Sequence, residues 1–285
     1  MLECVYLQLP SRISWPEKRE LVKKAELIGC GGVSLSSLPP NNDIFQELGN
    51  VLTKTTLNVA FSILSPIIMP INDLEIKIRT FSEIHDSKRY FFALGTGDSS
   101  FIREAGIDTR KTFSAFTEKV LELKDRFNKN FFSNNVYIAG SGPKMLQFAK
   151  ENNMKILYNG IWQDDVMKKH SDINTFIMAH LGSIETLSTD VFDIILKILI
   201  GLPKSVINNL NIDEEIIKNL KSSLKNKISL ENIKNQIPLE VLNKVAFVGN
   251  ISELNQLLNN FKKKGGKKII LSLTPHNNWN QLIKL

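Results

Sequence analysis

The chain has 285 residues, 42% of them hydrophobic, and a formal charge of +7 at pH 7 with an isoelectric point near 9.2. This composition predicts a globular protein with a large core. The apolar run Ile194–Ile200 is interrupted by Lys197, and no basic segment followed by an apolar one opens the chain. We therefore expect neither a membrane span nor a signal peptide.

The candidate strands, in chain order, fall near residues 3–9, 32–36, 56–64, 89–94, 135–139, 155–158, 174–180 and 268–273. Segments with helical periodicity lie between them, such as the one with Phe113, Phe116, Val120 and Leu123. Strands that alternate with helices form a parallel sheet, and eight of them in a chain of this length predict an α/β fold, a closed (β/α)8 TIM barrel.

One connection breaks this rhythm. Residues 183–247 separate the seventh and eighth predicted strands and carry helical patterns around 191–200, 214–224 and 230–237. We therefore predict one domain, 1–285, with a helical insertion at about 183–247. An insertion on this side of a barrel can form a lid or partner surface, or simply add packed helices.

The distribution of charge and of cysteines indicates which ligands and which cellular compartment to expect. The lysines are scattered over amphipathic helices with few aromatic residues between them, so we expect no nucleic-acid partner, whereas the basic charge suits an anionic ligand. Cys4 and Cys30 lack metal-ligand spacing, and no histidine, cysteine and carboxylate pattern predicts a metal. We expect a reduced protein of the cytoplasm.

The segment Val136–Ala149 combines a short apolar run, the turn Gly140-Ser-Gly142 and Pro143. Glycines let a ligand approach the backbone, and proline suits the first turn of a helix. Free N–H groups at Lys144, Met145 and Leu146 would then face an anion such as a phosphate. The same pattern also closes ordinary α/β units, so both interpretations stay open.

Three further segments have distinctive ends: Leu57-Asn-Val-Ala-Phe-Ser-Ile-Leu-Ser-Pro66, Arg89-Tyr-Phe-Phe-Ala-Leu-Gly-Thr-Gly-Asp98, and Val248-Gly-Asn-Ile-Ser-Glu-Leu254 with the Gly265-Gly pair that follows it. Together with Val136–Ala149, their order resembles the bacterial-luciferase-like flavin and deazaflavin oxidoreductases. The greatest similarity is to the coenzyme F420-dependent methylenetetrahydromethanopterin reductases. The resemblance covers most of the chain outside the insertion.

The chain also departs from this family's pattern. An aspartate usually follows the second strand, where this chain has Ser34-Leu-Ser-Ser-Leu38, and an acidic position near the end of the first strand falls at Leu7 or Gln8. The arginine expected after the third strand is replaced within residues 67–70. These departures indicate a diverged enzyme, or one with an altered substrate and cofactor, rather than a faithful reductase.

Ligands of such barrels bind at the carboxyl ends of the strands. Polar residues predicted there are Gln8, Ser36, Ser37, Ser62, Ser65, Thr96, Asp98, Ser141, Asn159, His180, Thr274 and His276. The resemblance implies coenzyme F420, or alternatively FMN, held by Ser37, Ile63, Leu64, Ser65, Gly95, Thr96, Gly97, Gly140, Ser141, Gly142 and Asn159. It implies Asp98 as the catalytic carboxylate, although a helix-capping aspartate would look the same.

Two functions follow from the residues and the resemblance. The first is an F420- or FMN-dependent oxidoreductase of the luciferase-like and monooxygenase family, which transfers hydride to or from a small organic substrate. A reaction like that of methylenetetrahydromethanopterin reductase is the candidate, and a homodimer is the expected state. The second is a barrel that has lost catalysis and acts as a binding or assembly subunit, which the missing charged positions favour.

Overall fold

The computed structural model describes residues 2–11, 13–37, 43–97, 99–104, 106–161, 173–202, 204–274, 279 and 281–282. Nine strands lie within these ranges. They are β1 (Val5–Gln8), β2 (Gly32–Leu35), β3 (Asn58–Leu64), β4 (Tyr90–Leu94), β5 (Val136–Ala139), β6 (Lys155–Asn159), β7 (Ile173–Leu181), β8 (Phe247–Gly249) and β9 (Ile269–Thr274).

Eight of these strands close into a parallel barrel. Strands β1 to β7 pair in sequence order, β7 then pairs with β9, and β9 pairs with β1. The (β/α)8 TIM-barrel fold predicted from the sequence is therefore confirmed, and each predicted strand overlaps the observed one. Closure leaves no edge strand in the barrel itself.

Strand β8 was not predicted, and it lies beside the barrel rather than in it. The first half of β7 pairs with β6, up to Asn159 opposite Phe176, and its last residues pair with β8, where Ala179 lies opposite Phe247. The Asn243 side chain bonds the other edge of β8, with its Oδ1 accepting from the Val248 amide at 2.8 Å. A three-residue strand is too short to show a period in the sequence.

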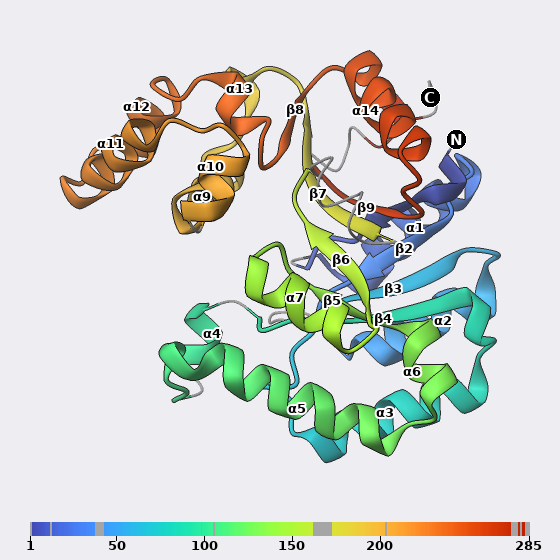
Figure 1. Ribbon diagram of the computed structural model, residues 1–285. Coiled ribbons are helices and arrows are strands. Elements are labelled where there is room, and N and C mark those ends of the chain that lie inside the picture. The colour runs from blue at the N-terminus through green and yellow to red at the C-terminus, as the bar shows by residue number, and fades with distance from the viewer. Residues whose placement is uncertain are drawn as a thin grey trace.

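Helices surround the barrel and fill the insertion, which Figure 1 shows as a separate group of helices beside the barrel. Around the barrel lie α1 (Trp15–Leu27), α2 (Ile44–Lys54), α3 (Ile71–Ile84), α4 (Ser99–Glu104), α5 (Thr112–Arg126), α6 (Lys129–Asn135), α7 (Pro143–Glu151) and α14 (Ile251–Lys263). The insertion contains α9 (Thr189–Gly201), α10 (Lys204–Asn209), α11 (Glu214–Lys225), α12 (Leu230–Lys234) and α13 (Leu239–Leu242).

Side-chain caps fix where several helices begin. Ser14 accepts from the Glu17 amide while the Glu17 carboxylate accepts from the Ser14 amide, which forms a capping box at α1. Asn250 and Glu253 form the same arrangement at α14. Such caps satisfy amide groups that the first helical turn leaves without partners.

Three clusters of buried side chains stabilise the molecule. The largest lies between the barrel strands and the surrounding helices, and a small one with Tyr6, Phe91 and Tyr137 fills the barrel interior. The third belongs to the insertion and includes Phe192 and Leu196 of α9. No helix in the described ranges is long and apolar enough to cross a membrane.

Two lysines contact buried groups in different ways: Lys18 is buried, and Lys268 is partly buried. Lys18 of α1 forms an ion pair with Glu47 of α2 at 3.0 Å, and both side chains are almost fully buried. Lys268 lies over two aromatic rings of the barrel interior, with Nζ 5.4 Å from the centre of the Tyr6 ring and 4.9 Å from that of Phe91. Burial, with a smaller effect of Lys155, lowers the pKa of Lys268 to about 8.

Candidate functional site

A cavity of about 700 Å³ opens at the carboxyl ends of the barrel strands. Its lining comprises Gln8, Leu9, Pro10, Ser11, Ser36, Ser62, Ile63, Gly95, Thr96, Gly97, Ala139, Gly140, Ser141, Leu157, Asn159, Phe176, Met178, Ser188, Asp190, Val191, Ile194, Ser272 and Thr274. Every barrel strand, or the segment that directly follows it, contributes to this lining. The volume falls in the range of small-molecule and cofactor sites.

The structure brings most of the predicted ligand-binding residues to this cavity. Those that border it are Ile63, Gly95, Thr96, Gly97, Gly140, Ser141 and Asn159. Four others do not border the cavity: Ser37, Leu64, Ser65 and Gly142. Asp98 and His276 lie outside the described residues.

Ser37 and Ser65 bond the backbone of the loops that carry the lining residues. The Ser37 amide and hydroxyl both donate to the Ile63 carbonyl, each at 3.0 Å. The Ser65 hydroxyl donates to the Thr96 carbonyl at 2.8 Å. Leu64 is fully buried in the core outside the barrel. These contacts hold the ends of β3 and β4 in a fixed position.

The end of β3 is irregular. The register between β3 and β4 shifts between Ser62 and Leu64, and the Ser62–Ile63 peptide bond is cis. The Ile63 side chain then lies against the backbone at Gly95, where a Cβ atom would come within 2.8 Å of its Cδ1. Glycine at position 95 therefore lets the two strand ends lie close together at the cavity.

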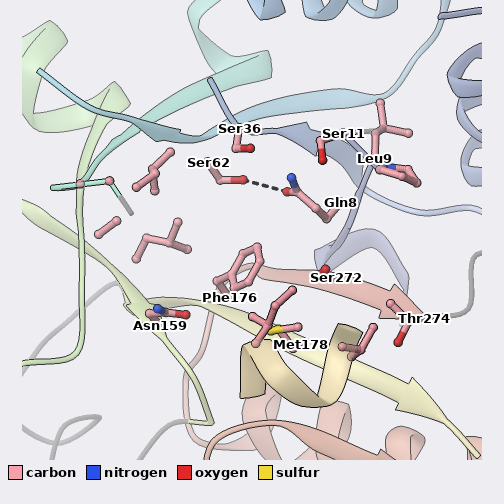
Figure 2. Close-up of a pocket in the computed structure, with 18 of the residues that line it drawn as sticks. Gln8, Leu9, Ser11, Ser36, Ser62, Asn159, Phe176, Met178, Ser272 and Thr274 are labelled. Atoms are coloured by element: carbon pink, nitrogen blue, oxygen red, sulfur yellow. Dashed lines mark hydrogen bonds between the residues drawn. The ribbon is translucent and has the colours of Figure 1, made fainter. Parts of the chain in front are cut away.

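A small polar cluster from three strands forms one wall. The Gln8 Oε1 atom accepts a hydrogen bond from the Ser62 hydroxyl at 3.0 Å and another from the hydroxyl of Ser34. Figure 2 shows Gln8 and Ser62 pointing toward each other above the cavity. With its oxygen occupied, the Gln8 side chain has only its amide N–H groups left to offer to a ligand.

The opposite wall is more apolar. Phe176 and Met178 of β7 face the cavity from the side opposite Gln8 (Figure 2). Helix α9 of the insertion adds Asp190, Val191 and Ile194. None of these α9 residues was predicted from the sequence. An acidic residue in the first turn of a helix is common because it complements the helix dipole, so no sequence signal marked Asp190.

The predicted anion site at the start of α7 has fewer free amide groups than the sequence led us to expect. Gly142 is the N-cap, but the Met145 and Leu146 amides both donate to the Gly142 carbonyl, at 3.0 and 3.1 Å. These two amides are therefore unavailable to an anion, contrary to the expectation from the sequence. Among the described residues, no backbone hydrogen bond occupies the amide of Lys144. Gly142 has an ordinary φ of −72°, so this position does not require glycine for its backbone angles.

A metal ion would need a cluster of ligands that the described residues lack. Within the described ranges, no group of three histidine, cysteine or carboxylate side chains could hold a metal ion. His180 is buried, with its Nε2 atom 2.9 Å from the Thr186 hydroxyl, and it does not border the cavity. Burial lowers the pKa of His180, so the neutral ring is favoured.

Solved structures share this fold along nearly the whole chain. The coenzyme F420-dependent tetrahydromethanopterin reductase of Methanopyrus kandleri has a TM-score of 0.76 and 14% identity, over 98% of this chain and 96% of that one. An F420-dependent secondary alcohol dehydrogenase in complex with an F420-acetone adduct has a TM-score of 0.63 and 12% identity, over 98% and 96%.

A Pseudomonas putida monooxygenase in complex with FMN, the oxygenating constituent of 3,6-diketocamphane monooxygenase, has a TM-score of 0.58 and 12% identity, over 98% of this chain and 94% of that one. No family model matches the chain, and no curated protein matches it by sequence. The resemblance to the luciferase-like oxidoreductases is thus confirmed at the level of the fold.

Proposed function

We propose that the chain is a luciferase-like oxidoreductase that uses coenzyme F420, or alternatively FMN, to transfer hydride to or from a small organic substrate. The observation that carries this proposal is the cavity of about 700 Å³ at the barrel mouth, bordered by the predicted glycine-containing turns. F420- and FMN-dependent enzymes share the fold over nearly the whole chain. A reaction like that of methylenetetrahydromethanopterin reductase is the finer proposal, in one cytoplasmic domain that forms a homodimer.

The volume of the cavity and the backbone at its lining support this proposal. The backbone from Gly95 to Gly97 and the Ile63 side chain would lie along the ring system, and Gly140, Ser141 and the Lys144 amide would hold the phosphate-bearing tail. Ser37 and Ser65 would not contact the cofactor but would hold these loops in place through hydrogen bonds to backbone carbonyls. Gly142 and Leu64 would contribute only to the conformation of the loops.

The bound cofactor would supply the hydride chemistry, which needs little acid–base assistance from the protein. The residues of this chain would orient the two reactants and exclude water. Phe176, Met178 and Val191 supply the apolar wall for that purpose. Asp98 directly follows Gly97 in the sequence and remains the proposed catalytic carboxylate.

The substitution Asp98→Asn distinguishes a catalytic role of Asp98 from a role as a helix cap. Asparagine caps a helix about as well as aspartate, so a purely structural Asp98 predicts an unchanged rate. A carboxylate that polarises substrate or cofactor predicts a lower turnover with an unchanged cofactor affinity. Steady-state rates and cofactor titrations of the two proteins distinguish these outcomes.

Titration with F420 and with FMN tests the cofactor directly, and Gly142→Val tests the anion site. A Cβ atom at Gly142 meets no protein atom within 4 Å, so the variant should fold normally. If the tail lies there, the added side chain should weaken cofactor binding by about tenfold or more. Gly201→Val, at the equally open end of α9, is the matched control. Unchanged midpoints for Gly142→Val would remove the anion site.

One observation favours the alternative function, a barrel without catalysis that binds or assembles with a partner. Gln8, one of the two positions at which the family pattern would have an acidic residue, borders the cavity, and its oxygen already accepts hydrogen bonds from Ser34 and Ser62. A protein that binds neither F420 nor FMN at high micromolar concentration would leave this alternative as the function.

A further inference from the structure

Helix α9 carries the only ionisable side chain among the described residues of the cavity lining. That side chain is Asp190, and no lysine, arginine or histidine accompanies it. The described lining therefore has a formal charge of −1, although the whole chain has +7. The basic surface of the protein and the charge of this cavity have opposite signs.

The Asp190 carboxylate has no ion pair with any described residue. Asp193, one turn further along α9, is different because it forms an ion pair with Lys197 and does not border the cavity. Asp190 is exposed, and within the described ranges no cationic side chain pairs with it, so its charge is available to a ligand of the cavity.

The surroundings of Asp190 on the same helix are apolar. Val191 and Ile194 also border the cavity, and Ile194 is 48% exposed although other residues of the same helix pack into a core. Met178 of β7 continues this apolar surface. A ligand that covered it would bring a terminal group close to Asp190.

We propose that the insertion selects the substrate through Asp190, which accepts hydrogen bonds from a cationic or amidine-like N–H donor while Val191 and Ile194 contact the apolar body of the molecule. Anionic substrates are disfavoured at the same place because of charge repulsion. The statement that this ligand is the substrate rests on the proposed function. The preference of the cavity for positive charge does not.

Benzamidine and benzoate test this preference because they have nearly the same shape and opposite charges. Calorimetric titration at low salt, with the cofactor-free protein, should show benzamidine binding at least about fivefold more tightly than benzoate. Asp190→Asn should abolish the difference, and Asp190→Glu should retain most of it. Asp193→Asn, which changes the same charge on the same helix, should leave it unchanged.

A missing preference in the natural protein, or one that survives in Asp190→Asn, would overturn the inference. So would an equal loss in Asp193→Asn. Parallel titrations with F420 and FMN separate the two proposals. Cofactor binding without the benzamidine preference would overturn only the role of Asp190, whereas the preference without binding of either cofactor would overturn only the proposed function.

Discussion

Gln8 and Ser62 are joined by a 3.0 Å hydrogen bond although their strands, β1 and β3, are not neighbours in the barrel. Ser34 of the intervening strand β2 donates to the same Gln8 oxygen. The cluster therefore ties three consecutive strands together at the cavity. It also determines which polar group this wall presents to a ligand.

Gln8→Leu should destabilise the protein by about 1–3 kcal/mol because it leaves the buried Ser34 hydroxyl without its acceptor. Urea denaturation measures this change in the free energy of unfolding. Ser11→Ala removes a hydroxyl from the same cavity lining and should change stability by no more than about 0.5 kcal/mol. Equal effects of the two substitutions would contradict a structural role for the cluster.

Glu47→Gln should destabilise the protein by about 3–5 kcal/mol, since it leaves the Lys18 ammonium buried without its carboxylate. The double variant Lys18→Met, Glu47→Leu should recover much of that loss because it removes both charges. Thermal and chemical denaturation of both variants test this. A single variant as stable as the natural protein would show that the pair contributes little.

Lys268→Met should raise the free energy of unfolding at pH 7 by about 1 kcal/mol, because an apolar group replaces a partly buried charged amine that lies over the Tyr6 and Phe91 rings. The pKa of Lys268 is about 8 in the folded protein, against an ordinary value of 10.5 in the unfolded chain, so the folded state loses this proton first as pH rises. Stability from this group is therefore lowest below pH 8 and increases up to pH 10.5.

The advantage of Lys268→Met should accordingly shrink between pH 8 and pH 10. Denaturation curves at pH 7, 8, 9 and 10 measure it. Lys267→Met is the control, because Lys267 is exposed and adjacent, and its effect should be small at every pH. A constant difference across this range would show that Lys268 titrates normally.

Gly97→Ala should destabilise the protein by about 1 kcal/mol or more. Gly97 has a φ of +88°, and a Cβ atom there would lie 3.0 Å from the Ile68 side chain. Gly201→Ala, at a helix end with open space, should be neutral or stabilising. Melting temperatures of the two variants should therefore move in opposite directions or differ clearly, and similar shifts would contradict the strain at Gly97.

The barrel could be predicted because its strands are short apolar runs with clear boundaries. The run predicted at 174–180 is β7, which spans Ile173–Leu181. Strand β8 was missed because three residues between Asn243 and the cap at Asn250 show no period, and its pairing depends on β7. Tertiary contacts, and not local preference, form this strand.

The site could be predicted only in part, because the sequence shows which residues lie at the strand ends but not where their side chains point. Position at the carboxyl end of a predicted strand places a residue at the barrel mouth, and this succeeded for Thr96 and Asn159. It does not say whether a serine faces the cavity or bonds a nearby carbonyl, as Ser37 and Ser65 do. Asp190 escaped prediction because its helix reaches the cavity only through the tertiary fold.

Strand β7 pairs with β6 along its first half and with β8 at its end, and this limits how far the protein can be shortened to a minimal barrel. Joining Gly182 directly to Asn250 would delete β8. The residues of β7 from Ala179 to Leu181 would then lose the strand with which they pair. The backbone groups of that stretch would then form an open sheet edge, which invites pairing with another chain. A shortened variant would need a charged or proline-bearing segment over this edge to keep the trimmed molecule from aggregating.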